Sequence, residues 1–152
     1  MFLATWNKSK QLLHLSYIGR VQSEELKRGL EDIKTLLAEL SPGFRLLVDL
    51  GRLEFMEQAC AKEIGLTMEM VDRSGVGLVV RVIPDPSTDI GMNILTAFHY
   101  AHRPRIITCQ NIIEAAGLLG LSNAANRTRA FAVRWVGTPR CGVRAAYQQR
   151  GA

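Results

Sequence analysis

The chain has 152 residues, of which 47% are hydrophobic and 22% charged, with a formal net charge of +5. This composition predicts one globular domain that can bury a core without a metal or disulfide, and no apolar run reaches the ~18 residues of a membrane span. The N-terminus lacks the basic and apolar segments of a signal peptide. The 3 cysteines, Cys60, Cys109 and Cys141, are far apart, which indicates reduced thiols and a cytoplasmic protein.

The predicted elements follow the order strand, strand, helix, strand, helix, strand, helix, strand, helix. Alternating and continuous apolar runs predict the strands, and apolar residues at helical spacing predict the helices. The strands are expected at residues 1–6, 11–18, 44–49, 76–83 and 106–109. The helices are expected at about residues 23–40, 57–72, 88–99 and 111–120, with Ser23 and Asn111 as N-caps. The second helix has one apolar line of Cys60, Ile64, Met68 and Val71, and the third carries Ile90, Ile94 and Phe98 at helical spacing.

Strand–helix–strand units favour right-handed crossovers between adjacent parallel strands, and the first two strands form a hairpin. We therefore expect an α/β domain with a mixed sheet of four or five strands and about four helices. The charge divides the chain at the end of this domain. Residues 1–121 carry 13 Lys and Arg against 14 Asp and Glu, whereas residues 122–152 carry six Arg and no acid. The sequence thus predicts a domain at 1–121 and a basic, Arg-rich C-terminal extension at 122–152.

The segment around residues 46–71 carries the most specific motif. A buried strand ends on Asp49, a turn follows, and Phe55-Met56 precede the predicted opening of a helix at Glu57-Gln58-Ala59. This segment resembles the STAS family of anti-sigma-factor antagonists, in which a strand ending in Asp precedes Phe-Met-Asp-Ser-Ser-Gly. The resemblance implies a SpoIIAA-like fold for residues 1–121. It also implies that the second Ser of the motif, the family's phosphorylation switch, is replaced by Ala59.

The expected switch needs a hydroxyl to carry the phosphate. Between Gly51 and Leu66 the sequence has no Ser, Thr or Tyr, and Thr67 lies about two helical turns further on. We therefore expect a scaffold that keeps the family fold and is not switched by phosphorylation at this loop.

The resemblance implies a non-enzymatic bacterial regulatory module that binds a protein partner, with an anti-sigma-type kinase or signalling complex as the expected class. The docking surface of this chain would comprise Glu57, Gln58 and Ala59. Phe55 and Met56 would fix the position of the loop that carries them. A homodimer is left open. We predict no catalytic residue, metal or cofactor. Two alternatives remain: a small-molecule or lipid-binding module, favoured by an apolar cavity between helix and sheet, and nucleic-acid contact through the basic extension.

Other polar groups have simpler explanations than a site. Asp49, Glu54 and Glu57 could hold a cation or act as acid and base, but a solvated turn explains them more simply. His99 and His102 lie three residues apart near a predicted helix end, yet no local ligand completes a metal site.

Two further features lie near the predicted helix starts and at the C-terminus. Ser87 and Thr88 lie at the start of the third helix, where a hydroxyl typically acts as an N-cap, and they are also candidates for modification. In the extension, six Arg alternate with Phe131, Trp135 and Tyr147, which is compatible with nucleic-acid binding. Because residues 130–133 are apolar, we expect residues 130–136 (AFAVRWV) to pack on the domain or across a dimer instead.

Overall fold

The computed structural model describes residues 1–85 and 89–121, and the elements within them follow the predicted order. The strands are β1 (Phe2–Asn7), β2 (Leu12–Val21), β3 (Arg45–Met56), β4 (Leu78–Val82) and β5 (Arg105–Cys109). The helices are α1 (Ser23–Leu37), α2 (Cys60–Arg73), α3 (Asp89–His99) and α4 (Ile112–Leu118). The predicted α/β class is confirmed.

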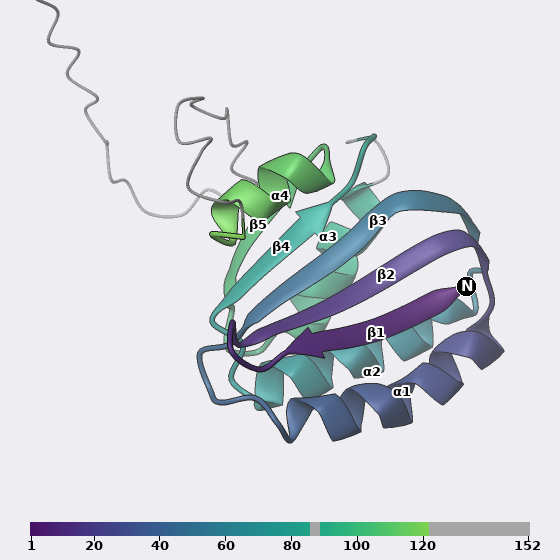
Figure 1. The fold of residues 1–152 in the computed structure, drawn as a ribbon. Coiled ribbons are helices and arrows are strands. Elements are labelled where there is room, and N and C mark those ends of the chain that lie inside the picture. The colour runs from purple at the N-terminus through teal and green to yellow at the C-terminus, as the bar shows by residue number, and fades with distance from the viewer. Residues whose placement is uncertain (86–88, 122–152) are drawn as a thin grey trace, which may run out of the picture.

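The strands of the described part form one five-stranded mixed sheet in the order β1-β2-β3-β4-β5. β1 runs antiparallel to β2, and the other neighbours are parallel. Helices α1, α2 and α3 lie on one face of the sheet, and α4 lies on the other (Figure 1). As expected for parallel sheets, both faces of the central strands are covered.

The core is divided between the two faces of the sheet. Alternate residues of each strand point to opposite faces, so neighbours in sequence enter different clusters. Leu46 and Val48 of β3 pack with α1 and α2 residues such as Ile33 and Val71. Leu47 packs instead with the cluster under α4, which also contains Val80, Ile107 and Leu119. The predicted apolar line of α2 is confirmed, because its members are all buried: Cys60, Ile64, Met68 and Val71.

β3 is longer than predicted, and this extension builds the site. The sequence indicated that the strand ends at Asp49, but β3 continues to Met56. β4 pairs with β3 only as far as Asp49, whereas β2 stays paired to Met56, with register irregularities along the way. Gly51 and Arg52 suggested a turn because they are not apolar, yet pairing with β2 keeps them extended.

Two helix details also differ from prediction. The N-cap of α1 is Gln22 and not Ser23, and the backbone amide of Gln22 donates to Glu25 Oε2 over 3.4 Å. In α3, Ile94 and Phe98 recur at the predicted helical spacing but are exposed, while Met92 and Leu95 pack against the core. Helical spacing alone predicts an apolar face but does not say whether that face is covered.

Candidate functional site

The loop between β3 and α2 contains the predicted partner-binding residues. The helix was expected to open at Glu57 but begins at Cys60, so Glu57, Gln58 and Ala59 form the connection. The backbone amide of Glu57 donates to Val21 O over 3.3 Å, and that of Cys60 donates to Glu57 O over 2.9 Å. These bonds close a tight turn against the end of β2.

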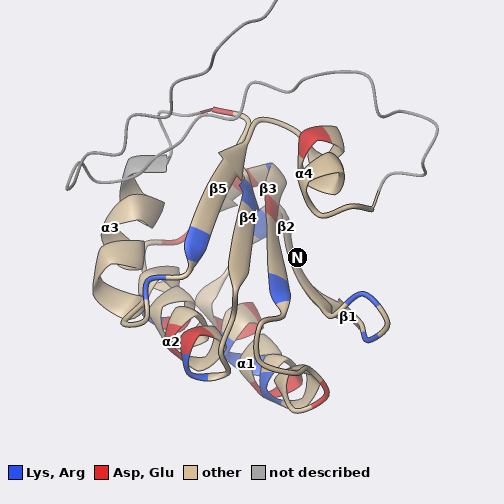
Figure 2. Ribbon diagram, turned by 90° about the vertical axis from the view of Figure 1, so that its left-hand side faces the viewer, with Lys and Arg blue, Asp and Glu red and all other residues tan. Residues whose placement is uncertain are grey.

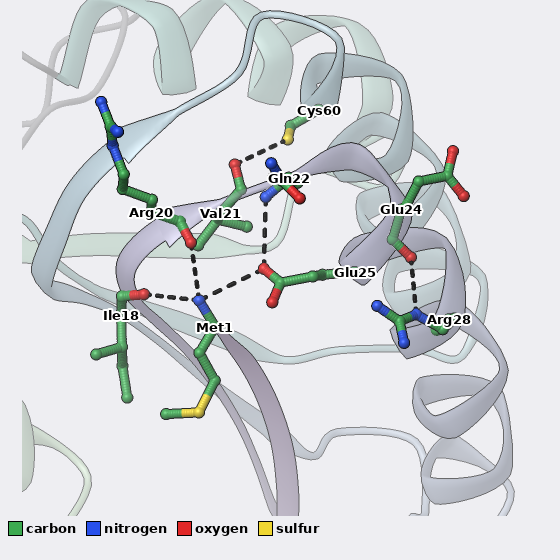
Figure 3. A network of polar contacts seen from close by, with 9 residues as sticks. All are labelled: Met1, Ile18, Arg20, Val21, Gln22, Glu24, Glu25, Arg28 and Cys60. Atoms are coloured by element: carbon green, nitrogen blue, oxygen red, sulfur yellow. Dashed lines mark hydrogen bonds and ion pairs between the residues drawn. The ribbon is translucent and has the colours of Figure 1, made fainter.

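A polar network fixes the end of β2 beside this loop (Figure 3). The amino group of Met1 donates to Ile18 O over 2.8 Å and to Arg20 O over 2.9 Å. The same amino group lies 3.4 Å from Glu25 Oε2, which also accepts from the amide of Gln22. The network therefore joins β1, β2 and the first turn of α1, and it supports the strand on which the loop rests.

A groove of about 740 Å³ opens where β3 and β4 end and α2 and α3 begin. Ligands of open α/β sheets gather at the carboxyl ends of strands, and pockets of this size hold small ligands or anchoring side chains. The apolar part of the lining includes Leu53, Phe55, Met56, Ile83, Met92 and Ile94. Its acidic groups are Glu54, Glu57 and Asp85, and none of the described lining residues is Lys or Arg.

Four of the five predicted partner-binding residues line this groove. Phe55, Met56, Glu57 and Gln58 line it, whereas Ala59 lies outside the lining at the N-cap of α2. The Phe55 side chain is 51% exposed, which is unusual for a large aromatic residue unless something covers it. The structure thus brings four of the five residues together around one apolar surface.

Helix α3 supplies a wall that the sequence analysis did not assign to the site. Figure 2 shows that α3 carries almost no charge, in contrast to the charged outer faces of α1 and α2. Ile94 is 54% exposed in the groove wall, and Phe98 one turn further along is 80% exposed. The available signal was the absence of Lys, Arg and Glu from residues 89–99, since a surface helix normally has a polar outer face.

The three carboxylates expected near the strand end do not form one cluster. Glu54 and Glu57 line the groove, but Asp49 lies within β3 and does not. Asp49 Oδ1 accepts a hydrogen bond from the amide of Gly51 over 2.9 Å. The shared acid–base or cation site considered for these groups therefore has no geometric support.

The two histidines near the end of α3 are engaged separately. His99 Nδ1 lies 3.0 Å from Glu69 Oε1, and His102 Nδ1 lies 2.9 Å from Asp72 Oδ2. Within residues 1–85 and 89–121, no group of three or more His, Cys, Asp and Glu side chains is arranged to hold a metal. These histidines join α3 and the residues after it to α2.

The nucleophilic groups near the loop are buried. Cys60 is fully buried, with Sγ 3.7 Å from Val21 O, and burial together with the nearby Glu57 carboxylate raises the pKa of its thiol. Burial also raises the pKa of Cys109 to about 11. Thr67 is buried, and its Oγ1 donates to Glu63 O over 2.9 Å. Neither thiols with a raised pKa nor an engaged hydroxyl are poised as nucleophiles.

Some predictions fall outside the described residues: the hydroxyls of Ser87 and Thr88, the third cysteine Cys141, and the extension at 122–152. Among the described helices, none has both the length and the apolar character needed to cross a membrane.

Three solved structures resemble this architecture. The anti-sigma factor antagonist SpoIIAA in its unphosphorylated form aligns with a TM-score of 0.55 at 14% identity, over 79% of this chain and 98% of SpoIIAA. The phosphorylated form of the Bacillus cell fate determinant SpoIIAA gives 0.55 at 14% identity, over 78% and 99%. A DUF3478 protein from Shewanella loihica PV-4 gives 0.58 at 12% identity, over 78% and 92%.

The chain has the SpoIIAA-like fold. The fold implied by the STAS resemblance is therefore confirmed. No family model and no curated protein matches the sequence. Because the identities are this low, the SpoIIAA-like fold is what the likeness establishes, and the role of the groove has to be argued from its own chemistry.

Proposed function

We propose that this chain is a non-enzymatic regulatory module of the bacterial cytoplasm that docks a protein partner in the groove between the β3–α2 loop and α3. The observation that carries the proposal is the half-exposed Phe55 beside the uncharged wall formed by Ile94. An apolar surface rimmed by polar groups typically marks an interaction site. Two SpoIIAA structures of the same fold are named as an antagonist of anti-sigma factors or as a cell fate determinant.

The chemistry of the groove supports one kind of protein partner. An apolar side chain of the partner fits the groove because the floor is apolar. A few such buried anchors supply most of the binding energy in protein interfaces. Glu54 and Glu57 at the rim favour basic residues beside that anchor and disfavour acidic ones. We propose an anti-sigma-type kinase or a related signalling complex as the partner, with a homodimer as a further assembly that this face could form.

We further propose that phosphorylation of the β3–α2 loop does not control this docking. Residues 52–66 contain no hydroxyl side chain. Thr67 is the nearest hydroxyl along α2, and it is buried and engaged by the backbone of its own helix. A kinase requires an accessible hydroxyl, so a partner that prefers the uncharged loop would bind constitutively.

A pull-down from the native host tests the docking face. Full-length protein with Glu57→Lys and Gln58→Ala is compared with unchanged protein and with a control carrying Glu31→Lys, an exposed position on α1. We expect the loop variant to lose partner recovery and the control to keep it. Equal recovery by all three proteins would show that the partner binds elsewhere.

A small-molecule or lipid-binding function is the second candidate, and the groove volume of about 740 Å³ favours it. Ligand pockets commonly fall between about 300 and 1,000 Å³ and are lined mainly by apolar groups. A native mass spectrum of protein purified from its host tests this alternative. An added mass from a bound molecule, lost on Ile94→Glu substitution, would support the ligand-binding function. A spectrum that shows only the mass of the protein would count against it.

A further inference from the structure

The groove has the chemistry of a receptor for a short, basic and apolar peptide. Its described floor is aliphatic and aromatic, whereas Glu54 and Glu57 place negative charge at the rim without a cationic lining residue. Arg20 lies beside Phe55, with its guanidinium carbon 5.4 Å from the centroid of the ring, so it places one positive charge near the groove although it is not a lining residue. A segment in which Arg residues flank large apolar side chains would match both parts of this surface.

The chain contains such a segment. Residues 130–136 read Ala-Phe-Ala-Val-Arg-Trp-Val, and Arg127 and Arg129 precede them. The whole stretch from residue 122 to 152 carries six Arg and no Asp or Glu. Residues 1–121 are almost neutral by comparison. The positive charge is therefore concentrated in residues 122–152, which also carry three aromatic side chains, Phe131, Trp135 and Tyr147.

The chain is long enough to reach the groove. Arg45 at the start of β3 donates to Leu119 O over 2.5 Å, so α4 ends near the opposite end of the strand from Phe55. Phe55 lies ten residue steps beyond Arg45 along β3, which corresponds to roughly 33 Å. The 14 residues after Leu121, up to and including Trp135, can extend to roughly 46–50 Å. The extended chain exceeds the span along β3 by roughly 13–17 Å. That excess is the length with which it would pass from the α4 face of the sheet to the groove on the other face (Figure 1).

We propose that residues 130–136 of the same chain dock in the groove, with Trp135 as the apolar anchor and Arg129 and Arg134 beside the carboxylates of Glu54 and Glu57. A tethered segment has an effective concentration of about 1 mM. A segment that binds with an intrinsic Kd of about 0.1 mM would then occupy the groove most of the time and weaken an external partner roughly tenfold. This regulatory consequence rests on the proposed function, whereas the docking itself does not.

Fluorescence of the full-length chain tests the docking without any partner. The protein has 2 tryptophans, and Trp6 in β1 is replaced by Phe so that Trp135 becomes the only reporter. We expect blue-shifted Trp135 emission and several-fold weaker quenching by acrylamide than in denaturant. The double variant Glu54→Lys, Glu57→Lys should restore the red-shifted emission and the strong quenching. The control Glu31→Lys, Asp32→Lys makes the same charge change on exposed positions of α1 and should retain protection.

A second groove variant, Ile94→Glu, removes the apolar contact at a half-exposed position and should also expose Trp135. Circular dichroism confirms that each variant is folded before its fluorescence is read. Trp135 that is solvent-exposed in the parent protein, or that stays protected in both groove variants, would overturn the proposal. Protection that disappears on dilution would also overturn it, because the segment would then be supplied by a second copy. The pull-down of an external partner is a separate experiment. Its failure would contradict the proposed function but would leave the fluorescence result for residues 130–136 unchanged.

Discussion

Arg20 and Phe55 face each other across the parallel pairing of β2 and β3, with the Arg20 guanidinium carbon 5.4 Å from the centroid of the Phe55 ring. This contact orients a large aromatic side chain at the groove while half of its surface stays exposed. An exposed cation–π pair contributes only about 0.5–1 kcal/mol to folding. This contact therefore contributes little to folding and leaves half of the Phe55 ring accessible at the groove.

Phe55→Ala should separate binding from folding. We expect the free energy of unfolding to fall by only about 1–2 kcal/mol, because half of the ring is already exposed, while loss of an anchor should weaken partner binding by about 2 kcal/mol or more. Urea unfolding and titration calorimetry measure the two quantities. The control is Ile113→Ala on α4, where the side chain is 69% exposed on the other face of the sheet. If both variants weaken binding equally, Phe55 is not an anchor.

Gly65→Ala should loosen the packing of α2 against α3. A Cβ added at Gly65 would lie 2.6 Å from His99 Nε2, and moving the His99 ring would disturb its contact with Glu69. Such overpacking typically costs about 1–3 kcal/mol, which lowers the melting temperature of a domain this size by several degrees. Gly91→Ala on α3 is the matched control, because an added Cβ there meets nothing within 4 Å. A melting temperature that is unchanged in both variants would show that the α2–α3 contact tolerates the methyl group.

Asp72 should be a major polar determinant of stability. Its side chain is 3% exposed, and Oδ2 accepts from the amide of Ala101 over 3.0 Å and from the amide of His102 over 3.2 Å. We expect Asp72→Ala to reduce the free energy of unfolding by about 2 kcal/mol, because two part-buried backbone amides lose their carboxylate acceptor. His102→Ala should cost less than about 1 kcal/mol, since the His102 side chain is 76% exposed and the backbone bonds remain. Chemical denaturation of both variants would refute this ranking if His102→Ala were the more damaging.

His14 should make the protein sensitive to mild acid. Burial lowers the pKa of His14 below its ordinary value of 6.5, although the Asp49 carboxylate opposes this shift. The folded state therefore binds fewer protons than the unfolded state, so the stabilisation is present above pH 6.5 and is lost as the pH falls towards the folded pKa. NMR titration of the imidazole gives the pKa directly. His14→Leu should reduce the loss of stability between neutral and mildly acidic pH. If the loss is unchanged in this variant, other titrating groups cause it.

Much of the fold could be predicted because hydrophobic periodicity was clear in each element. The apolar line of α2 and the capping of α4 at Asn111 both hold, and Asn111 Oδ1 accepts from the amides of Ile113 and Glu114. The end of β3 could not be predicted, since Gly51 and Arg52 look like a turn and only pairing with β2 keeps them in a strand. Long-range pairing of this kind overrides local preference.

The candidate site was predictable only on one side. The motif Phe55-Met56-Glu57-Gln58 identified the β3 end of the groove, because a local sequence pattern encodes it. The α3 wall was missed, since Ile94 and Phe98 fit the spacing of a buried face equally well. Packing of α3 through Met92 and Leu95 decides which face is covered, and this depends on contacts distant in sequence.

The most direct test of the proposed docking site is site-specific photocrosslinking in the native host. A photoreactive amino acid replaces Gln58, which is exposed at the groove, in one full-length protein and Glu31 on α1 in another. We predict a discrete covalent adduct with a partner protein from position 58 and none from position 31. An adduct with the same partner from position 31, with none from position 58, would contradict the account.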